Sequence, residues 1–481
     1  MDEILGLDRA ALDRARISRD PRFDGKFFIA VTSTGVYCRP VCPSRSSNSA
    51  NVRYYATAAE AAEAGFRPCL RCRPEAAPGT PAWLGTSAVV RRALKLIDDG
   101  ALDETSVGAL AADLGIGPRH LHRLFVQHVG ASPVTVAQTR RVHFAKRLLD
   151  DTTLPITQIA LAAGFGSVRR FNSAFRSVYG RAPRELRRQR GGGSADEVVL
   201  RLAFRPPYDW SQVRACLAAR AFPGVERVDD RGYARTVAGN GGHAIVCVRP
   251  VEPDEPDEPD EKEHALELRV CGASPGELFQ LSAAARRMFD LAADPARIAR
   301  AFERDPLLGP LVAERPGLRI AGAWDPFEQA VRAVLGGRSR AAAAVVARAG
   351  RAVDGAADGL THLFPSPEAL ATADLDGLGL SAPRAASLRA LARAVAGGGL
   401  DLAAPSDRVL AALAALPGFG ADAAQDVALR ALGEPDAFPA GDVALRRAAA
   451  AGAAPLSARA LAARAEAWRP WRGYAAFLLR R

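Results

Sequence analysis

The sequence predicts a multidomain α+β protein with four parts. Its 481 residues are enough for three or more domains, and a hydrophobic content of 48% is ample for globular cores. Four of the seven cysteines crowd into residues 38–72, which predicts a small metal-binding domain over 1–80. Beyond it, the apolar spacing is helical over 85–190, alternates as in strands over 197–273, and is helical again over 277–481. We therefore expect an all-α domain, a small α/β domain and a second all-α domain, in that order.

The cysteines have the spacing of a metal site. Cys38 and Cys42 form a C-x3-C pair, and Cys69 and Cys72 form a C-x2-C pair after 26 intervening residues. Two close pairs brought together by one chain reversal supply four thiolates to a tetrahedral Zn²⁺. Two disulfides are the alternative, but cytosolic cysteines stay reduced and nothing else in the chain looks secreted. We expect one Zn²⁺ held by all four.

The segments around these cysteines match a known family. Residues 29–45, 51–53 and 64–74 resemble the Ada-type DNA methylphosphotriester acceptor domain along almost its whole length. The resemblance implies that Cys38 takes a methyl group from a methylated DNA phosphate and keeps it. The cysteine spacing alone does not show which of the four cysteines reacts. A Zn²⁺ with four thiolates carries a net charge of about −2. Methylation removes one negative charge facing the DNA, so affinity should rise. Arg45 and Arg67 are candidate DNA contacts here.

Charge is concentrated in the first part of the chain. The net charge is +11, and residues 1–190 hold 29 Lys and Arg against 17 Asp and Glu. This imbalance predicts nucleic-acid binding by the amino-terminal half. The sequence has no apolar run near the roughly 20 residues that span a bilayer, and its acidic start is unlike a signal peptide. We expect a bacterial cytoplasmic, nucleoid-associated protein without membrane contact.

Two helix-turn-helix patterns follow the metal-binding part. Residues 106–125 turn at Gly115 and residues 156–175 turn at Gly164, each joining an Ala-rich helix to a basic one. One such unit also fits an ordinary helical bundle, whereas two in tandem are more specific. With Pro183, the segment resembles the AraC-type DNA-binding domain over about a hundred residues, which implies binding to promoter DNA and, as a partner, RNA polymerase. The candidate base or phosphate contacts, some of which could be only surface charge, are Arg119, His120, Arg123, Ser167, Arg169 and Arg170.

The α/β region follows a Gly-rich hinge at 190–194. Alternating segments at 198–204, 232–237, 243–248 and 265–271 predict strands, and 210–221 predicts a helix. The Pro-Asp-Glu repeats at 253–261 suit a disordered insertion between two strands. Cys216, Cys247 and Cys271 lack ligand spacing and are expected in the core.

The last domain carries a Gly-rich turn, Leu416-Pro-Gly-Phe-Gly420. Such a turn between helices presents backbone N–H groups to a DNA phosphate, so Gly418 and Gly420 are candidate contacts. With its later motifs and the preceding α/β domain, the segment resembles the AlkA-type helix-hairpin-helix DNA glycosylases over about 285 residues. The resemblance implies excision of alkylated purines such as 3-methyladenine. It also implies that Asp442 stabilises positive charge on the sugar; a helix N-cap is the alternative and compatible role.

Several residue types bound the chemistry of this domain. The last lysine is Lys262, so a Schiff-base lyase mechanism is excluded, and no cysteine follows Cys271, so we expect no iron-sulfur cluster. The segment departs from the family by placing Asp422, Asp426 and Arg338 where aromatic and apolar groups are usual. These changes either tune the pocket toward cationic bases or weaken it. The competing hypothesis is therefore a pure regulator and methylation sensor whose carboxy-terminal half only binds DNA.

Overall fold

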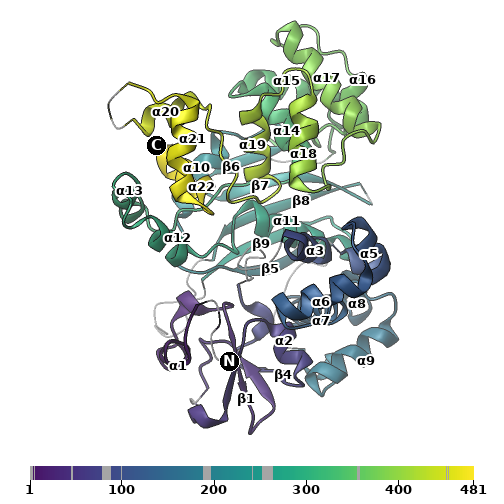
Figure 1. Cartoon of the computed structure of the whole chain (residues 1–481). Coiled ribbons are helices and arrows are strands. Elements are labelled where there is room, and N and C mark those ends of the chain that lie inside the picture. The colour runs from purple at the N-terminus through teal and green to yellow at the C-terminus, as the bar shows by residue number, and fades with distance from the viewer. Residues whose placement is uncertain are drawn as a thin grey trace. The chain divides into compact units, whose positions relative to one another are not determined.

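The computed structural model describes residues 4, 6–44, 47–78, 88–98, 100–187, 197–240, 242–251, 264–354, 358–450, 452 and 454–480. They form two units (Figure 1). The first holds the chain up to residue 206 with 251–283 and 291–293, and the second holds 207–250, 284–290 and 294–481. The expected region 197–273 is divided between them, so the domain bounds stay predictions. The hinge and the Pro-Asp-Glu repeats lie outside the described residues. None of the described helices is long and apolar enough to cross a membrane.

The first unit begins with a four-stranded sheet of order β3-β1-β2-β4. The strands are β1 (Phe28–Val31), β2 (Val36–Cys38), β3 (Val52–Tyr55) and β4 (Arg67–Pro68). Strand β1 is buried along its whole length because helices α1 (Arg9–Ile17) and α2 (Ala58–Glu63) supply core residues to its two faces. Ile29 packs with Leu12 of α1, whereas Phe28 and Ala30 pack with Ala61 of α2.

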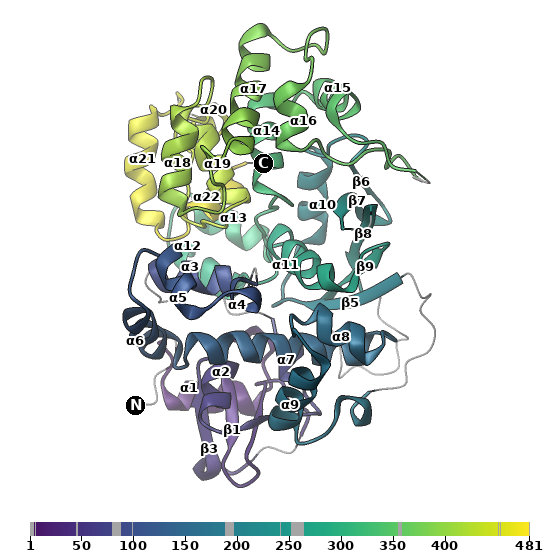
Figure 2. The same ribbon diagram turned by 90° about the vertical axis from the view of Figure 1, so that its right-hand side faces the viewer.

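Seven helices follow in the first unit, and they confirm the all-helical region. They are α3 (Ala88–Asp98), α4 (Ala101–Glu104), α5 (Val107–Asp113), α6 (Pro118–Val129), α7 (Pro133–Asp151), α8 (Ile156–Ala162) and α9 (Val168–Tyr179). The two predicted helix-turn-helix pairs are α5–α6 and α8–α9, joined by the long α7 (Figure 2). Gly164 turns the second pair with φ +77°, and a Cβ there would lie 2.6 Å from an Asp103 oxygen, so only glycine fits.

Helix α7 also packs on later parts of the same unit. The alternation predicted both strand β5 (Glu197–Ala203) and strand β9 (Ala265–Cys271), and the structure pairs them antiparallel. The Phe144 ring of α7 meets the Phe279 ring edge-on at 4.9 Å between centroids. Arg205, fully buried, donates hydrogen bonds to the carbonyls of Asp24 (2.9 Å) and Ala292 (2.8 Å). These contacts join the strand pair to both amino-terminal domains.

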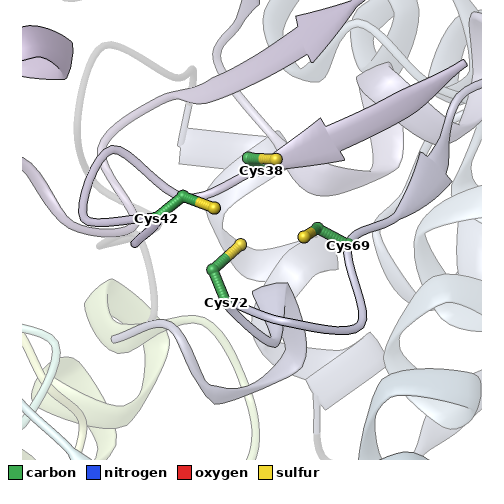
Figure 3. A group of neighbouring side chains, drawn as sticks. All are labelled: Cys38, Cys42, Cys69 and Cys72. Atoms are coloured by element: carbon green, nitrogen blue, oxygen red, sulfur yellow. The ribbon is translucent and has the colours of Figure 1, made fainter. Parts of the chain in front are cut away.

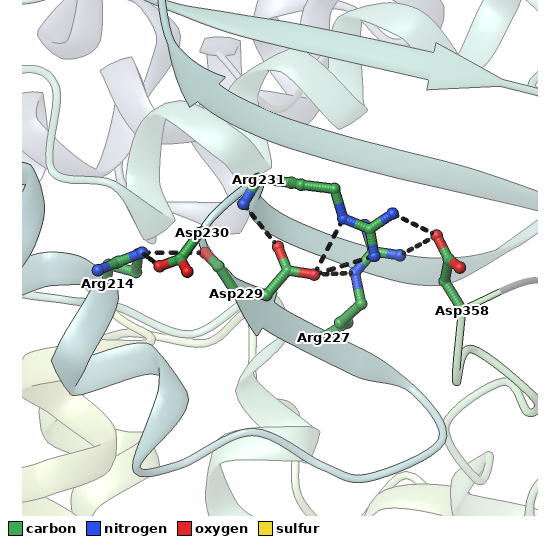
Figure 4. A network of polar contacts seen from close by, with 6 residues as sticks. All are labelled: Arg214, Arg227, Asp229, Asp230, Arg231 and Asp358. Atoms are coloured by element: carbon green, nitrogen blue, oxygen red, sulfur yellow. Dashed lines mark hydrogen bonds and ion pairs between the residues drawn. The ribbon is translucent and has the colours of Figure 1, made fainter.

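The second unit contains an antiparallel meander. Its strands are β6 (Glu226–Asp229), β7 (Gly232–Gly239) and β8 (Gly242–Pro250), preceded by helix α10 (Trp210–Ala218). The sequence did not predict β6, because its four residues show no apolar alternation. Figure 4 shows the ion pairs at the β6–β7 turn, where Asp358 lies 2.8 Å from the guanidinium groups of both Arg227 and Arg231. Because Asp358 and Arg231 are exposed, the pairs contribute little stability.

The rest of the second unit is helical, as predicted, apart from α11 (Leu278–Met288), which begins in the first unit. Its helices are α12 (Pro295–Phe302), α13 (Leu308–Glu314), α14 (Pro326–Leu335), α15 (Ser339–Ala349), α16 (Pro367–Thr372), α17 (Ala382–Ala396), α18 (Ser406–Ala415), α19 (Ala421–Arg430), α20 (Val443–Ala448), α21 (Ala458–Ala465) and α22 (Arg472–Leu479). The Gly-rich hairpin joins α18 to α19. Gly418 has φ +79°, and a Cβ there would lie 2.0 Å from the Ser387 Oγ, so any side chain would clash.

Candidate metal centre and candidate active site

The four predicted ligands meet in the first unit. Cys38 ends β2 and Cys69 follows β4, and the parallel pairing of these strands brings the two cysteine pairs together. Cys42 and Cys72 lie in the turns that follow. Their sulfurs all lie within 4.8 Å of one another, and Figure 3 shows them pointing toward a common centre. All seven cysteines lie in the described part of the chain, and all are free thiols. The structure therefore favours the metal site over two disulfides.

The donor set fits one Zn²⁺. Tetrahedral zinc–sulfur bonds of about 2.3 Å require sulfurs roughly 3.8 Å apart, and the cluster is nearly that tight. Hydrogen bonds with Cys42 and Cys69 raise the pKa of Cys38, and hydrogen bonds with the other three cysteines raise the pKa of Cys72, whereas the pKa values of Cys42 and Cys69 are lowered. Some of the sulfurs thus keep their protons to stabilise the others, so all four ionise together only around a cation. The backbone N–H of Arg39 donates to the Cys72 sulfur at 3.3 Å. This bond stabilises a thiolate.

The candidate DNA contacts of the first unit are mostly exposed. Arg119, His120 and Arg123 lie on the outer face of α6, while Leu121 and Phe125 of the same helix are buried. In the second helix-turn-helix pair, Ser167 caps α9: its hydroxyl oxygen accepts a hydrogen bond from the Arg170 backbone N–H.

The remaining candidates differ in their surroundings. Arg169 and Arg170 are exposed on α9, and Arg67 is exposed on β4, where its guanidinium lies against Gly180 at the end of α9. Arg45 lies outside the described residues. The positions of the described residues suit contact with a duplex, and their roles stay predictions.

Asp442 occupies the N-cap of α20. One carboxylate oxygen accepts hydrogen bonds from the backbone N–H groups of Ala444 (2.8 Å) and Leu445 (3.3 Å). The other oxygen accepts one from the Arg480 guanidinium at 2.7 Å. The capping role is therefore real, and it occupies only one of the two oxygens. Asp442 and Arg480 both line an open pocket of about 490 Å³.

Asp422 and Asp426, which the sequence marked as departures, both stabilise this pocket. Asp422 accepts a hydrogen bond from the Gly441 backbone N–H at 2.8 Å, which ties α19 to the turn carrying Asp442. Burial by itself raises the pKa of Asp426, but Arg430, Arg220 and Arg480 together lower it to about 2. Both carboxylates thus have defined protein partners.

Arg338, the third departure, lines the same pocket from the N-cap of α15. Its guanidinium donates to the Leu335 carbonyl at 3.3 Å. Sequence reasoning missed Arg220 and Arg480, which also line the pocket. No motif marks them: Arg480 follows the apolar run of α22, and Arg220 follows α10 in a different part of the chain. Only the folded chain brings these two arginines to the pocket that Asp442 lines.

The fold and the two sites define a fusion of a metal-binding sensor, a DNA-binding domain and a glycosylase-like half. Family models match residues 11–75 (metal binding domain of Ada), 110–189 (helix-turn-helix domain) and 199–325 (AlkA N-terminal domain). The chain is 42% identical over 476 residues to a Mycobacterium tuberculosis protein named "Probable bifunctional transcriptional activator/DNA repair enzyme AlkA", covering 96% of this chain and 94% of the relative. The chain belongs to this family of bifunctional transcriptional activator/DNA repair enzymes.

Two shorter relatives match its two halves. DNA-3-methyladenine glycosylase 2 of Escherichia coli is 35% identical over 283 residues, which is 57% of this chain and 94% of the relative. The bifunctional transcriptional activator/DNA repair enzyme Ada of Escherichia coli is 38% identical over 151 residues, 31% of this chain and 40% of the relative. The segments that these two relatives match separately are joined in this chain.

Proposed function

We propose that this chain senses and repairs DNA alkylation with two separate sites. In the first, the Cys38 thiolate attacks the methyl carbon of a DNA methylphosphotriester. A carbon–sulfur bond forms, the methyl carbon–oxygen bond breaks, and its electron pair stays on the phosphate as a diester anion. Zinc, when bound, would keep the cysteine sulfurs deprotonated. The tight four-thiol cluster on β2 and β4 supports this proposal.

The methylated first unit then acts as a transcriptional activator. Loss of one thiolate charge reduces repulsion from the DNA backbone, which raises promoter affinity for the two helix-turn-helix pairs. RNA polymerase is the proposed partner at the promoter, in the bacterial cytoplasm. Methylated and unmethylated protein should therefore differ in promoter affinity, and the difference should shrink as salt rises. Equal affinities at low salt would contradict the switch.

In the second unit, Asp442 stabilises the oxocarbenium-like sugar as an alkylated purine departs. The observation that carries this proposal is the division of its carboxylate on the pocket wall, with one oxygen capping α20 and the other bound by the Arg480 side chain rather than by the backbone. The glycosidic bond breaks with its electron pair on the base, and water adds to the sugar carbon and loses a proton. Chain cleavage is not expected, because no lysine follows residue 262.

One experiment tests both sites. The zinc-loaded protein is incubated with alkylated duplex, released bases are separated by chromatography, and the protein is weighed by mass spectrometry. We expect free 3-methyladenine and a gain of one methyl on the protein. The second candidate function is a pure regulator, which the Arg480–Asp442 ion pair favours because it neutralises the carboxylate. Methylated protein without released base would support that candidate.

A further inference from the structure

The second unit places a guanidinium directly beside the proposed catalytic carboxylate. Arg480 lies 2.7 Å from the Asp442 carboxylate, and another of its nitrogens lies 3.5 Å from Asp426. About a quarter of its side chain is exposed, on the wall of the pocket. One arginine therefore joins two carboxylates. It can release Asp442 toward a sugar while Asp426 still holds it.

The pocket has few alternatives for contact with an extruded base. Phe222 is the one aromatic residue among its described lining residues, and the Arg332 guanidinium already covers that ring at 3.7 Å from the centroid. Arg430 is buried against Asp426 and the Ala321 carbonyl. Stacking on an aromatic ring is thus not offered, whereas the planar guanidinium of Arg480 supplies both a flat face and hydrogen-bond donors.

The charge of the base decides what such a group does. An N-alkylated cationic purine leaves as a neutral molecule when the bond from C1′ to the base nitrogen breaks. A neutral lesion purine leaves with the bonding electron pair as an anion, spread over its ring nitrogens and any exocyclic oxygen, and then takes a proton from water. A guanidinium therefore stabilises departure of a neutral base and does little for a cationic one.

We propose that Arg480 is a selectivity residue of this glycosylase site, setting how fast neutral oxopurine lesions are released relative to cationic alkylpurines. On entry of the base, its guanidinium moves from Asp442 to the base and remains anchored at Asp426. This inference rests on the proposed role of Asp442 in base excision, and it adds a separate requirement that depends on leaving-group charge.

The test compares two lesions in the same duplex sequence. Hypoxanthine serves as the neutral base and 7-methylguanine as the cationic one, with single-turnover release measured for wild type, Arg480→Gln and Arg480→Lys. Because Arg480→Gln also frees Asp442, the readout is the ratio of the two release rates: we expect the hypoxanthine rate relative to the 7-methylguanine rate to fall about 10²-fold, the cost typical of losing one preorganised donor. Arg480→Lys keeps the charge and should restore part of the hypoxanthine rate. Arg300→Gln, an exposed arginine of α12 outside the pocket, is the matched control.

The outcomes separate this inference from the proposed function. Equal losses on both lesions with an unchanged melting temperature would reduce Arg480 to a positioning role for Asp442 and overturn the inference. Release of 7-methylguanine but not hypoxanthine by wild type would also overturn it, while leaving the glycosylase function intact. Release of neither base by wild type would overturn the glycosylase proposal itself.

Discussion

Arg73 and Asp150 form a buried ion pair between the cysteine loop and α7, with the Arg73 Nε 2.9 Å from a carboxylate oxygen of Asp150. Arg73 directly follows the ligand Cys72, and α7 connects the two helix-turn-helix pairs. The carboxylate of Asp150 is fully buried and also binds Lys146. About two turns earlier on α7, the Tyr37 hydroxyl lies 2.9 Å from the His143 ring. The metal-binding loop and the DNA-reading helices are therefore held in one folded unit.

Replacing Asp150 with alanine should destabilise the first unit by about 3 kcal/mol or more, because it leaves two buried cations without this partner. The described tryptophans all lie in the second unit, so zinc release to a chelating dye during urea titration is the better probe of the first. Asp113→Ala, at an exposed position of α5, is the control and should stay within about 0.5 kcal/mol of wild type. An Asp150→Ala midpoint equal to wild type would show that the pair contributes nothing.

Changing Cys38 to alanine should abolish methyl transfer, because the attacking sulfur is gone. Peptide mass spectrometry after incubation with methylated duplex measures the product. Cys271→Ala is the control, since this cysteine lies on β9 outside the metal cluster and should leave transfer intact. Unlike this control, Cys42→Ala and Cys69→Ala should lose zinc as well as methyl transfer. A methyl group found on another cysteine would refute the assignment.

The cysteine pairs and the helical hairpin could be predicted from sequence because each depends on short-range chemistry. Two cysteines within five residues indicate a metal site. The crowded turn with φ +79° requires glycine, so it is visible in the sequence as an L-P-G-x-G pattern. The ion pairs around Asp442 could not be predicted. The ion pairs join three distant segments, which carry Arg220, Asp426 and Arg480. Arginines occur throughout this chain, so nothing in the sequence distinguishes these two from the others. Strand β6 was also missed, because its edge position needs no apolar alternation.

Asp290 should make the stability of the second unit depend on pH. Burial raises the pKa of Asp290 to about 6, while the Tyr474 hydroxyl donates to its carboxylate at 2.7 Å. The unfolded value is about 3.9, so the folded state holds the proton more tightly between these limits. The stabilising contribution of Asp290 is complete below about pH 4 and is lost as pH rises through 6. The free energy of unfolding should fall by at most about 3 kcal/mol over this range.

The comparison of wild type with Asp290→Asn isolates this effect. Urea unfolding followed by tryptophan fluorescence reports mainly on the second unit, which holds four of the five tryptophans. Any loss of zinc at low pH affects both proteins alike. The wild-type free energy of unfolding, relative to the mutant, should fall between pH 4 and pH 7. A difference that stays constant over this range would show that Asp290 titrates normally.

Replacing Asp442 with asparagine should remove base excision while preserving the fold and DNA binding. Asparagine keeps the size and the oxygen that caps α20, so the hydrogen bonds to the backbone of Ala444 and Leu445 survive. It removes the negative charge that would stabilise the sugar, and an electrostatic group of this kind is commonly worth about 10²-fold or more in rate. Release of 3-methyladenine from duplex, measured at single turnover, gives the rate.

Asp325→Asn provides the matched control for this last prediction. Asp325 caps α14 with the same geometry, accepting hydrogen bonds from the backbone N–H groups of Phe327 (2.8 Å) and Glu328 (3.1 Å), and it lies outside the pocket. If Asp442 only caps a helix, both variants should excise base at the wild-type rate and melt at similar temperatures. If Asp442 acts on the sugar, the two will melt alike and only Asp442→Asn will lose excision. Similar rates in both variants would place the chemistry elsewhere in the pocket.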